Sequence, residues 1–155
     1  MSDIVVVNKT SKIKNRINTA SLEKLMTFFH EVDNLFVPPL RTHVNSIDEY
    51  AIKLKDNADV FEAWSGDELI GIAAVYLNNN ATKVGFITSV VVLKEYQKLG
   101  IARVLIRIAI EYAKKKGFKR LELEVNKDNE RAYNLYSEFG FTVEVTDNGR
   151  MRLEF

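Results

Sequence analysis

Hydrophobic positions in the first third of the chain form two kinds of pattern. Residues 4–7 (IVVV) are a short apolar run typical of a strand, whereas residues 8–18 are polar and basic and are compatible with a strand or a loop. From Ser21 on, apolar residues recur at the spacing of one helix face, at Leu22, Leu25, Met26, Phe29 and Val32. This part of the chain is therefore expected to hold a strand followed by a helix.

A connection between two helices is predicted for residues 33–44. Both prolines of the protein, Pro38 and Pro39, lie there, and neither fits a helix interior. A second helix is expected to begin at Ser46, because Ser46 and Glu49 are spaced as in a capping box, where each side chain accepts a hydrogen bond from a backbone N–H of the helix start. This helix is expected to end near residues 56–57.

The middle of the chain predicts a strand meander that leads into a long helix. Residues 59–64 and 69–77 are apolar runs on either side of a hairpin turn at residues 65–68, and a third strand is expected over residues 83–93. The helical pattern after Gly100 is apolar around most of its circumference, with only a narrow charged stripe. This helix is therefore expected to pack broadly against a sheet.

The last quarter of the chain predicts a strand, a short helix and a hairpin. The strand covers residues 121–125, and the helix is capped by Asp128 or Asn129 and stopped by Gly140. The hairpin pairs residues 141–145 with residues 151–155. The order of all these elements predicts a mixed α/β (α+β) layer fold.

Composition narrows the function classes without naming one. The 155 residues are expected to form a single domain, residues 1–155, and the net charge of +1 gives no support for a nucleic-acid or membrane partner. Cysteine is absent, which excludes thiolate metal sites, and neither His30 nor His43 has a partner at metal-ligand spacing. No apolar run approaches the roughly 18 residues that span a membrane, and the first residues are not typical of a signal peptide. A soluble, cytoplasmic protein without a metal is expected.

The strand-to-helix junction at Gly100 is the first candidate for chemistry. A tight turn into a helix points several backbone N–H groups outward at the positive end of the helix dipole, which favours a phosphate. Gly100 and the small Ala102 leave room for such a group to approach. The glycine alone is equally compatible with a turn that binds nothing. The nucleotide-binding patterns GxxxxGK[ST] and GxGxxG are both missing from the sequence.

Two motifs around this junction resemble those of one enzyme family. Residues 97–102 (QKLGIA) resemble the Q/R-x-x-G-x-G/A pyrophosphate-binding loop of the GNAT family of N-acetyltransferases, with Ala102 where glycine is common. Residues 123–141 resemble its second signature, LEV…N-x-x-A-x-x-L-Y-x-x-x-G-F, with the spacing intact, and the resemblance extends over about residues 86–143. It implies the GNAT acyltransferase fold: a mixed, mostly antiparallel central sheet flanked by about four helices and splayed between its fourth and fifth strands.

The resemblance implies that the protein uses acetyl-CoA as its acyl donor. Backbone N–H groups of the loop would hold the pyrophosphate, Lys98 and Arg103 would add positive charge, and Asn129 would lie near the pantetheine arm. A backbone N–H within residues 90–92 would polarise the carbonyl of the acetyl group, because the splayed strand leaves a donor unpaired there. The residues implied to bind acetyl-CoA are Val90, Val91, Val92, Gln97, Lys98, Leu99, Gly100, Ile101, Ala102, Arg103 and Asn129.

Two catalytic residues are also implied. Tyr136 occupies the position from which related enzymes protonate the CoA sulfur, and a phenol with an ordinary pKa of about 10 is protonated at neutral pH. Tyr133 is expected to pack instead. Glu124 occupies the position from which some members accept the proton of the amine, directly or through water, and water alone is the alternative base. Glu122 and Glu124 are expected to share one face of their strand.

The acceptor is expected to lie opposite CoA. In the resembled fold, the first two helices and their connection cover that side of the central cleft. Here the connection offers Phe36 as an apolar wall, Arg41 as a donor to carboxylate, phosphate or hydroxyl groups, and Asp33 as a partner for a cation. Tyr50 and Lys53 on the following helix are expected to face the same space.

The expected function is the transfer of an acetyl group from acetyl-CoA to a primary amine. The expected acceptor is a small molecule such as an amino sugar or an amino acid, and the protein is expected to be a monomer or a homodimer. Two alternatives remain open. One is acetylation of a protein N-terminal amine, whose enzymes the second signature also resembles, and the other is a CoA-binding module without catalysis.

Overall fold

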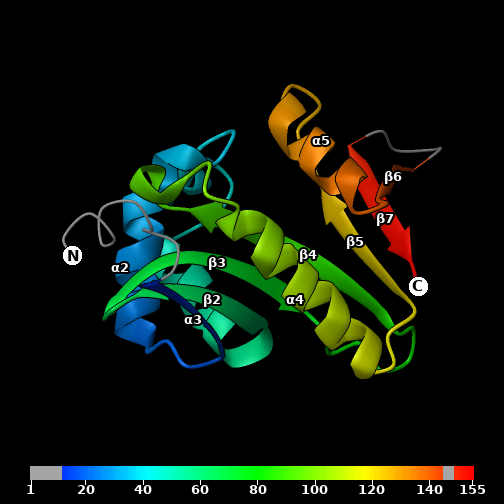
Figure 1. The fold of residues 1–155 in the computed structure, drawn as a ribbon, viewed down its shortest axis with the longest axis horizontal. Helices are drawn as coiled ribbons and strands as arrows, with labels where there is room; N and C mark the ends of the chain where they lie inside the picture. Colours follow the sequence, from blue (N-terminus) through cyan, green and yellow to red (C-terminus); the bar gives the residue numbers. More distant parts are fainter. Residues whose placement is uncertain (1–11, 145–148) are drawn as a thin grey trace.

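The computed structural model describes residues 12–144 and 149–155, which form one seven-stranded sheet flanked by helices (Figure 1). The strand expected over residues 4–7 and the tip of the final hairpin lie outside the described residues. The elements are β1 (Ile13–Ile17), α2 (Leu22–Val32), α3 (Ile47–Asn57), β2 (Asp59–Ser65), β3 (Glu68–Tyr76), β4 (Val84–Val92), α4 (Ile101–Lys115), β5 (Arg120–Glu124), α5 (Glu130–Glu138), β6 (Thr142–Val143) and β7 (Arg150–Glu154).

The strands lie in the order β1-β2-β3-β4-β5-β7-β6. Every neighbouring pair is antiparallel except β4 and β5, which are parallel and are joined by the crossover helix α4. The predicted mixed, mostly antiparallel sheet is therefore confirmed. Residues 13–17, within the segment whose pattern allowed a strand or a loop, form an edge strand beside β2.

Helices cover both faces of the sheet. A side chain at Gly71 of β3 would meet Ile101 of α4, so this position faces α4. Ala74 lies three residues further along β3 and points to the opposite face, and its partner Ser89 on β4 is hydrogen-bonded to Tyr50 of α3. Thus α4 packs on one face, and α3 with its neighbour α2 packs on the other (Figure 1).

Polar side chains cap three helices at or near the predicted positions. Ser21, Ser46 and Asn129 precede α2, α3 and α5, and each side-chain oxygen accepts a hydrogen bond from the backbone N–H three residues on, at 3.1, 3.2 and 3.2 Å. Such caps satisfy donors that have no partner within the helix. Asn129, rather than Asp128, is the residue that caps α5.

The fourth and fifth strands of the described sheet separate along their length. Register pairing between them covers only four residue pairs, from Val84 with Arg120 to Ile87 with Leu123. Beyond that point β4 continues to Val92 alongside β3 alone, while β5 ends at Glu124. The splay expected from the family resemblance is therefore present, and it opens a gap within the sheet where the candidate residues gather.

Candidate functional site

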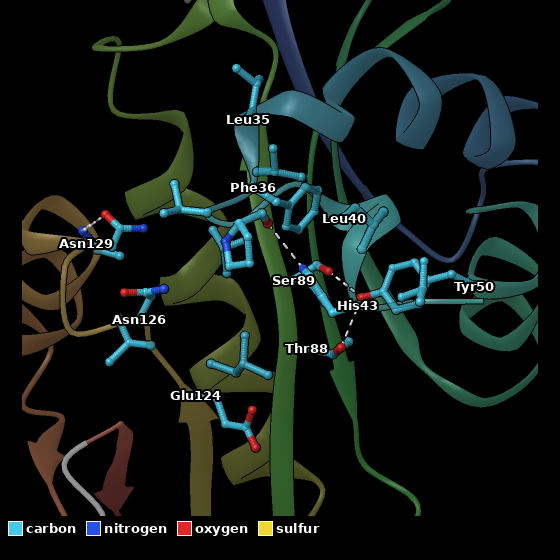
Figure 2. A pocket seen from close by; sticks show the side chains of 18 of the residues that line it. Leu35, Phe36, Leu40, His43, Tyr50, Thr88, Ser89, Glu124, Asn126 and Asn129 are labelled. Atoms are coloured by element: carbon cyan, nitrogen blue, oxygen red, sulfur yellow. Dashed lines mark hydrogen bonds between the residues drawn. The ribbon is translucent and has the colours of Figure 1, made fainter. Parts of the chain in front are cut away.

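Two cavities meet in the opening between β4 and β5. The connection cavity, about 840 Å³, lies between residues 35–44, α3, β4 and the end of β5 (Figure 2). The loop cavity, about 740 Å³, lies between the loop of residues 96–103, β4 and α5. Seven residues line both cavities: Leu35, Val37, Val90, Val91, Asn129, Ala132 and Tyr136. The cavities are therefore adjacent halves of one site, each of a size typical for small ligands.

The loop cavity collects the residues implied to bind acetyl-CoA. Ten of the eleven line it, and only Leu99 does not. Gly100 has the left-handed backbone angle φ +82° that glycine tolerates best, and a Cβ built on it would meet no atom within 4 Å. No side chain caps α4, so the N–H groups of its first turn face an open space. This space, at the positive end of a helix dipole, suits a pyrophosphate.

Side chains of the loop are already engaged within the protein. The side-chain amide of Gln97 donates to the carbonyl oxygen of Val92 at 3.1 Å, which ties the loop to the end of β4. Arg103 forms a two-point ion pair with Glu138 of α5, with Nε–Oε2 at 3.0 Å and Nη2–Oε1 at 3.1 Å. Hydrogen bonding to Arg103 lowers the pKa of the Glu138 carboxyl. A phosphate bound in the loop cavity would therefore have to compete with Glu138 for the guanidinium of Arg103.

One backbone N–H of β4 points into the splay at the junction of the cavities. The N–H of Leu93 donates to the carbonyl oxygen of Ile70 on β3. Because backbone N–H groups alternate in direction along a strand, the N–H of Val91 also points toward β3, and the N–H groups of Val90 and Val92 point away from it. Val92 lines only the loop cavity. Val90 lines both cavities, so its N–H is the donor that best reaches a group at the junction.

Tyr136 of α5 also lies at this junction. Its side chain is buried, and its ring packs against Phe141 with centroids 5.7 Å apart. Burial raises the pKa of Tyr136 well above the ordinary value of 10.0, so the phenol keeps its proton throughout the neutral range. Tyr133, one turn earlier, is 41% exposed and lines neither cavity. The structure therefore presents Tyr136, and not Tyr133, to the site.

Glu124 directly follows the last β5 residue that pairs with β4, and it lines the connection cavity (Figure 2). Its side chain is 69% exposed, and its Oε1 accepts a hydrogen bond from Nη2 of Arg150 at 3.1 Å. Glu124 is therefore an exposed carboxylate held by an arginine. Glu122 shares the same face of β5 and also pairs with Arg150, but it does not line the cavity.

The expected acceptor residues divide into two groups. Phe36, Tyr50 and Lys53 line the connection cavity. Asp33 and Arg41 do not, because they bind each other: the backbone N–H of Arg41 donates to Asp33 Oδ1 at 2.8 Å, and its guanidinium forms an ion pair with Asp33 Oδ2. These contacts hold residues 33 and 41 of the connection together. We therefore leave Asp33 and Arg41 out of the candidate acceptor site.

Several cavity residues were not found from the sequence. These residues are Thr88, Ser89 and Asn126, which line the connection cavity (Figure 2). His43 of the connection also lines this cavity, and its Nε2 donates to the carbonyl oxygen of Pro38 at 3.3 Å. The adjacent polar pair Thr88-Ser89 inside an otherwise apolar strand was a usable signal, because such residues need partners when buried. The connection was expected to border the acceptor side of the cleft, but its Leu35 lines the loop cavity as well as the connection cavity.

Among the described residues there is no cluster of three or more His, Asp or Glu side chains that could hold a metal ion. In the same part of the chain, no helix is long and apolar enough to cross a membrane.

Comparison with known proteins identifies the family. Residues 25–141, more than half of the chain, match the model of the acetyltransferase (GNAT) family. The uncharacterized N-acetyltransferase YsnE of Bacillus subtilis is 34% identical over 110 residues, which are 69% of this chain and 69% of YsnE. The uncharacterized N-acetyltransferase YvbK of the same organism is 29% identical over 102 residues, which are 66% of this chain and 62% of YvbK, so the chain spans about three fifths of that relative.

A solved structure supports the same fold. The PaiA N-acetyltransferase of Thermoplasma acidophilum, in complex with coenzyme A, superposes with a TM-score of 0.70 and 19% sequence identity, and the match covers 92% of this chain and 99% of that one. The splayed sheet, the loop before α4 and the family match agree with one another. The chain belongs to the acetyltransferase (GNAT) family.

Proposed function

We propose that the protein transfers the acetyl group of acetyl-CoA to the primary amine of a small molecule. The observation that carries this proposal is the junction itself. Tyr136 and Val90 line both cavities, so a phenolic proton and a backbone donor adjoin the boundary between a phosphate-binding half and an acceptor half. A transfer reaction needs such a boundary, because the donor and the acceptor must meet in one place.

In this proposal the loop cavity holds CoA. N–H groups of the first turn of α4 bind its pyrophosphate, and Gly100 keeps the approach open. Acetyl-CoA supplies a thioester whose acetyl group is activated for transfer to an amine. The N–H of Val90 donates to the acetyl carbonyl oxygen, where negative charge develops during transfer, and Tyr136 gives its proton to the departing sulfur.

Removal of the amine proton falls to Glu124 or to water. Glu124 lines the acceptor half, and its exposure allows a water molecule to bridge it to the amine. The hydrogen bond from Arg150 fixes the direction of this carboxylate. A carboxylate oriented toward the acceptor half is placed to accept a proton, so we propose Glu124 as the base.

The charges of the connection cavity favour an acceptor that carries an acidic group beside its amine. Lys53 lines this cavity with its Nζ 5.6 Å from the centroid of the Tyr76 ring, and no carboxylate in the described part of the chain pairs with it. Glu124, the one carboxylate among the described lining residues, shares Arg150 with Glu122. The ammonium of Lys53, with which no described carboxylate pairs, suits a carboxylate or phosphate and so favours an amino acid or an acidic amino sugar as the acceptor.

Acetyl-CoA consumption by the purified protein tests the proposal. A panel of amino acids, amino sugars, amino-sugar phosphates, polyamines and N-terminal peptides separates the acceptor classes. We expect turnover with a small amine that bears a carboxylate or phosphate. Turnover restricted to N-terminal peptides would replace the small-molecule acceptor by a protein amine. Binding of CoA with no turnover on any amine would point to a module without catalysis.

A further inference from the structure

The hydroxyl of Tyr50 on α3 contacts two consecutive residues of β4. Its oxygen lies 3.0 Å from Oγ1 of Thr88 and is also hydrogen-bonded to Oγ of Ser89 (Figure 2). Ser89 is 4% exposed, and the ring of Phe29 packs edge-on against the Tyr50 ring with centroids 5.2 Å apart. The Tyr50 hydroxyl therefore has a fixed place between the helix and the strand.

One hydroxyl reaches both residues because β4 has a bulge at this point. In a regular strand, consecutive side chains point to opposite faces of the sheet. Here Ala74 of β3 pairs with Ser89, but the next β3 residue, Val75, pairs with Ile87, so Thr88 is an extra residue in β4. A bulge places neighbouring side chains on the same side of the sheet. The two hydrogen bonds of the Tyr50 hydroxyl therefore depend on the bulged conformation of β4.

The bulge also marks the start of the splay. Pairing of β4 with β5 ends at Ile87, the residue directly before Thr88. The first N–H beyond the bulge that points into the splay belongs to Val90, and the peptide unit that carries it joins Ser89 to Val90. Fixing the position of Ser89 therefore fixes the direction of this N–H.

We propose that Tyr50 is a positioning residue that holds the β4 bulge and thereby aims the N–H of Val90 at the acetyl carbonyl oxygen. The proposal rests on the function proposed above and assigns Tyr50 a task other than contact with the acceptor. Hydrogen-bond donors of this kind act through alignment, so a small rotation of the peptide unit weakens them. Tyr50 acts here through Ser89 and donates nothing to the reacting atoms.

The test compares acetyl-CoA with CoA, which lacks the acetyl carbonyl. Calorimetric titration of the full chain gives the Kd of each ligand for wild-type protein and for Tyr50→Phe, which keeps the ring and removes the hydroxyl. We expect the Kd of acetyl-CoA to rise about fivefold, the effect of losing one neutral hydrogen bond, and the Kd of CoA to stay unchanged. Ser89→Ala should act in the same direction, and the double variant should add little to either single change, because both remove the same contact.

Tyr112→Phe is the matched control, because this half-buried tyrosine lies on α4 on the other face of the sheet and lines neither cavity. It should leave both affinities unchanged. A merely structural role of Tyr50 predicts a lower Tm and an unchanged ratio of the two Kd values. Equal changes in both affinities, or no change in either, would overturn the positioning role. Wild-type protein that binds neither ligand would instead contradict the proposed function.

Discussion

Ile87 of β4 and Leu123 of β5 are the last register pair between these strands, and the strands part directly beyond them. The proposed backbone donor at the junction of the two cavities follows from this separation. The N–H of Val90 has no partner on β5, and Tyr136 of α5 reaches the opening from the other side. The donor is a backbone group, so the separation of the strands, rather than a polar side chain, creates it.

The backbone of Gly100 should be required for acetyl-CoA binding. Its φ of +82° costs an alanine about 1–2 kcal/mol, whereas its Cβ meets no protein atom. Gly117, at the far end of α4, has φ +84° and equally open surroundings, so Gly117→Ala is a matched control. We expect Gly100→Ala and Gly117→Ala to lower the Tm by similar amounts. Only Gly100→Ala should raise the Kd of acetyl-CoA, by about tenfold or more, in calorimetric titration. Equal affinities in the two variants would reduce Gly100 to a turn residue.

Glu124→Gln should lower kcat by about 10²-fold if this carboxylate is the base. Glu122→Gln provides the control, because Glu122 lies on the same face of β5 and binds the same Arg150 but does not line the cavity. Steady-state rates with the best amine of the panel distinguish the outcomes. An unchanged kcat in Glu124→Gln would assign the proton to water, and a change confined to KM would make Glu124 an acceptor-binding residue.

Lys53→Met should remove a preference for acidic acceptors. The flexible thioether keeps the packing against Tyr76 and removes the charge. For an amine with a carboxylate, we expect KM to rise about tenfold, as for a lost charged hydrogen bond, while KM for the matching carboxamide stays unchanged. Lys115→Met on α4 removes an exposed charge far from both cavities and should alter neither value. Equal effects of Lys53→Met on the acid and the amide would show that Lys53 does not bind an anion.

The contact between Asp33 and Arg41 should make the connection sensitive to acid. Partial burial opposes ionisation of Asp33, but hydrogen bonds from the backbone and guanidinium of Arg41, together with its charge, lower the pKa of Asp33 below the ordinary 3.8. A lowered folded-state pKa gives stability that is present above the unfolded pKa and is lost as the pH falls through the folded value. Asp33→Asn should therefore lower the Tm at pH 7, and this deficit should shrink below about pH 4. A deficit that is constant from pH 7 to pH 3 would contradict this role of the charge.

The parts of the site that depend on local sequence were predictable. The loop at Gly100 is set by residue spacing within one strand–turn–helix unit, and the position of Tyr136 is set by spacing within one helix. The sequence motifs therefore predict both. The ion pair between Asp33 and Arg41 was not predictable, because it depends on how the connection turns back over eight residues. The bulge at Thr88 was missed for a related reason: alternation along one strand does not reveal the register against its neighbour.

Substitution of Tyr136 tests most directly whether the junction of the two cavities is the place of acetyl transfer. Tyr136→Phe keeps the buried ring against Phe141 and removes the proton. Tyr133→Phe on the same helix is the control, because that side chain lines neither cavity. Measurement of kcat, together with the Kd of acetyl-CoA, should show kcat reduced by about 10²- to 10⁴-fold in Tyr136→Phe at nearly unchanged affinity, and a wild-type kcat in Tyr133→Phe. A wild-type kcat in Tyr136→Phe would contradict the assignment of the catalytic proton to this junction.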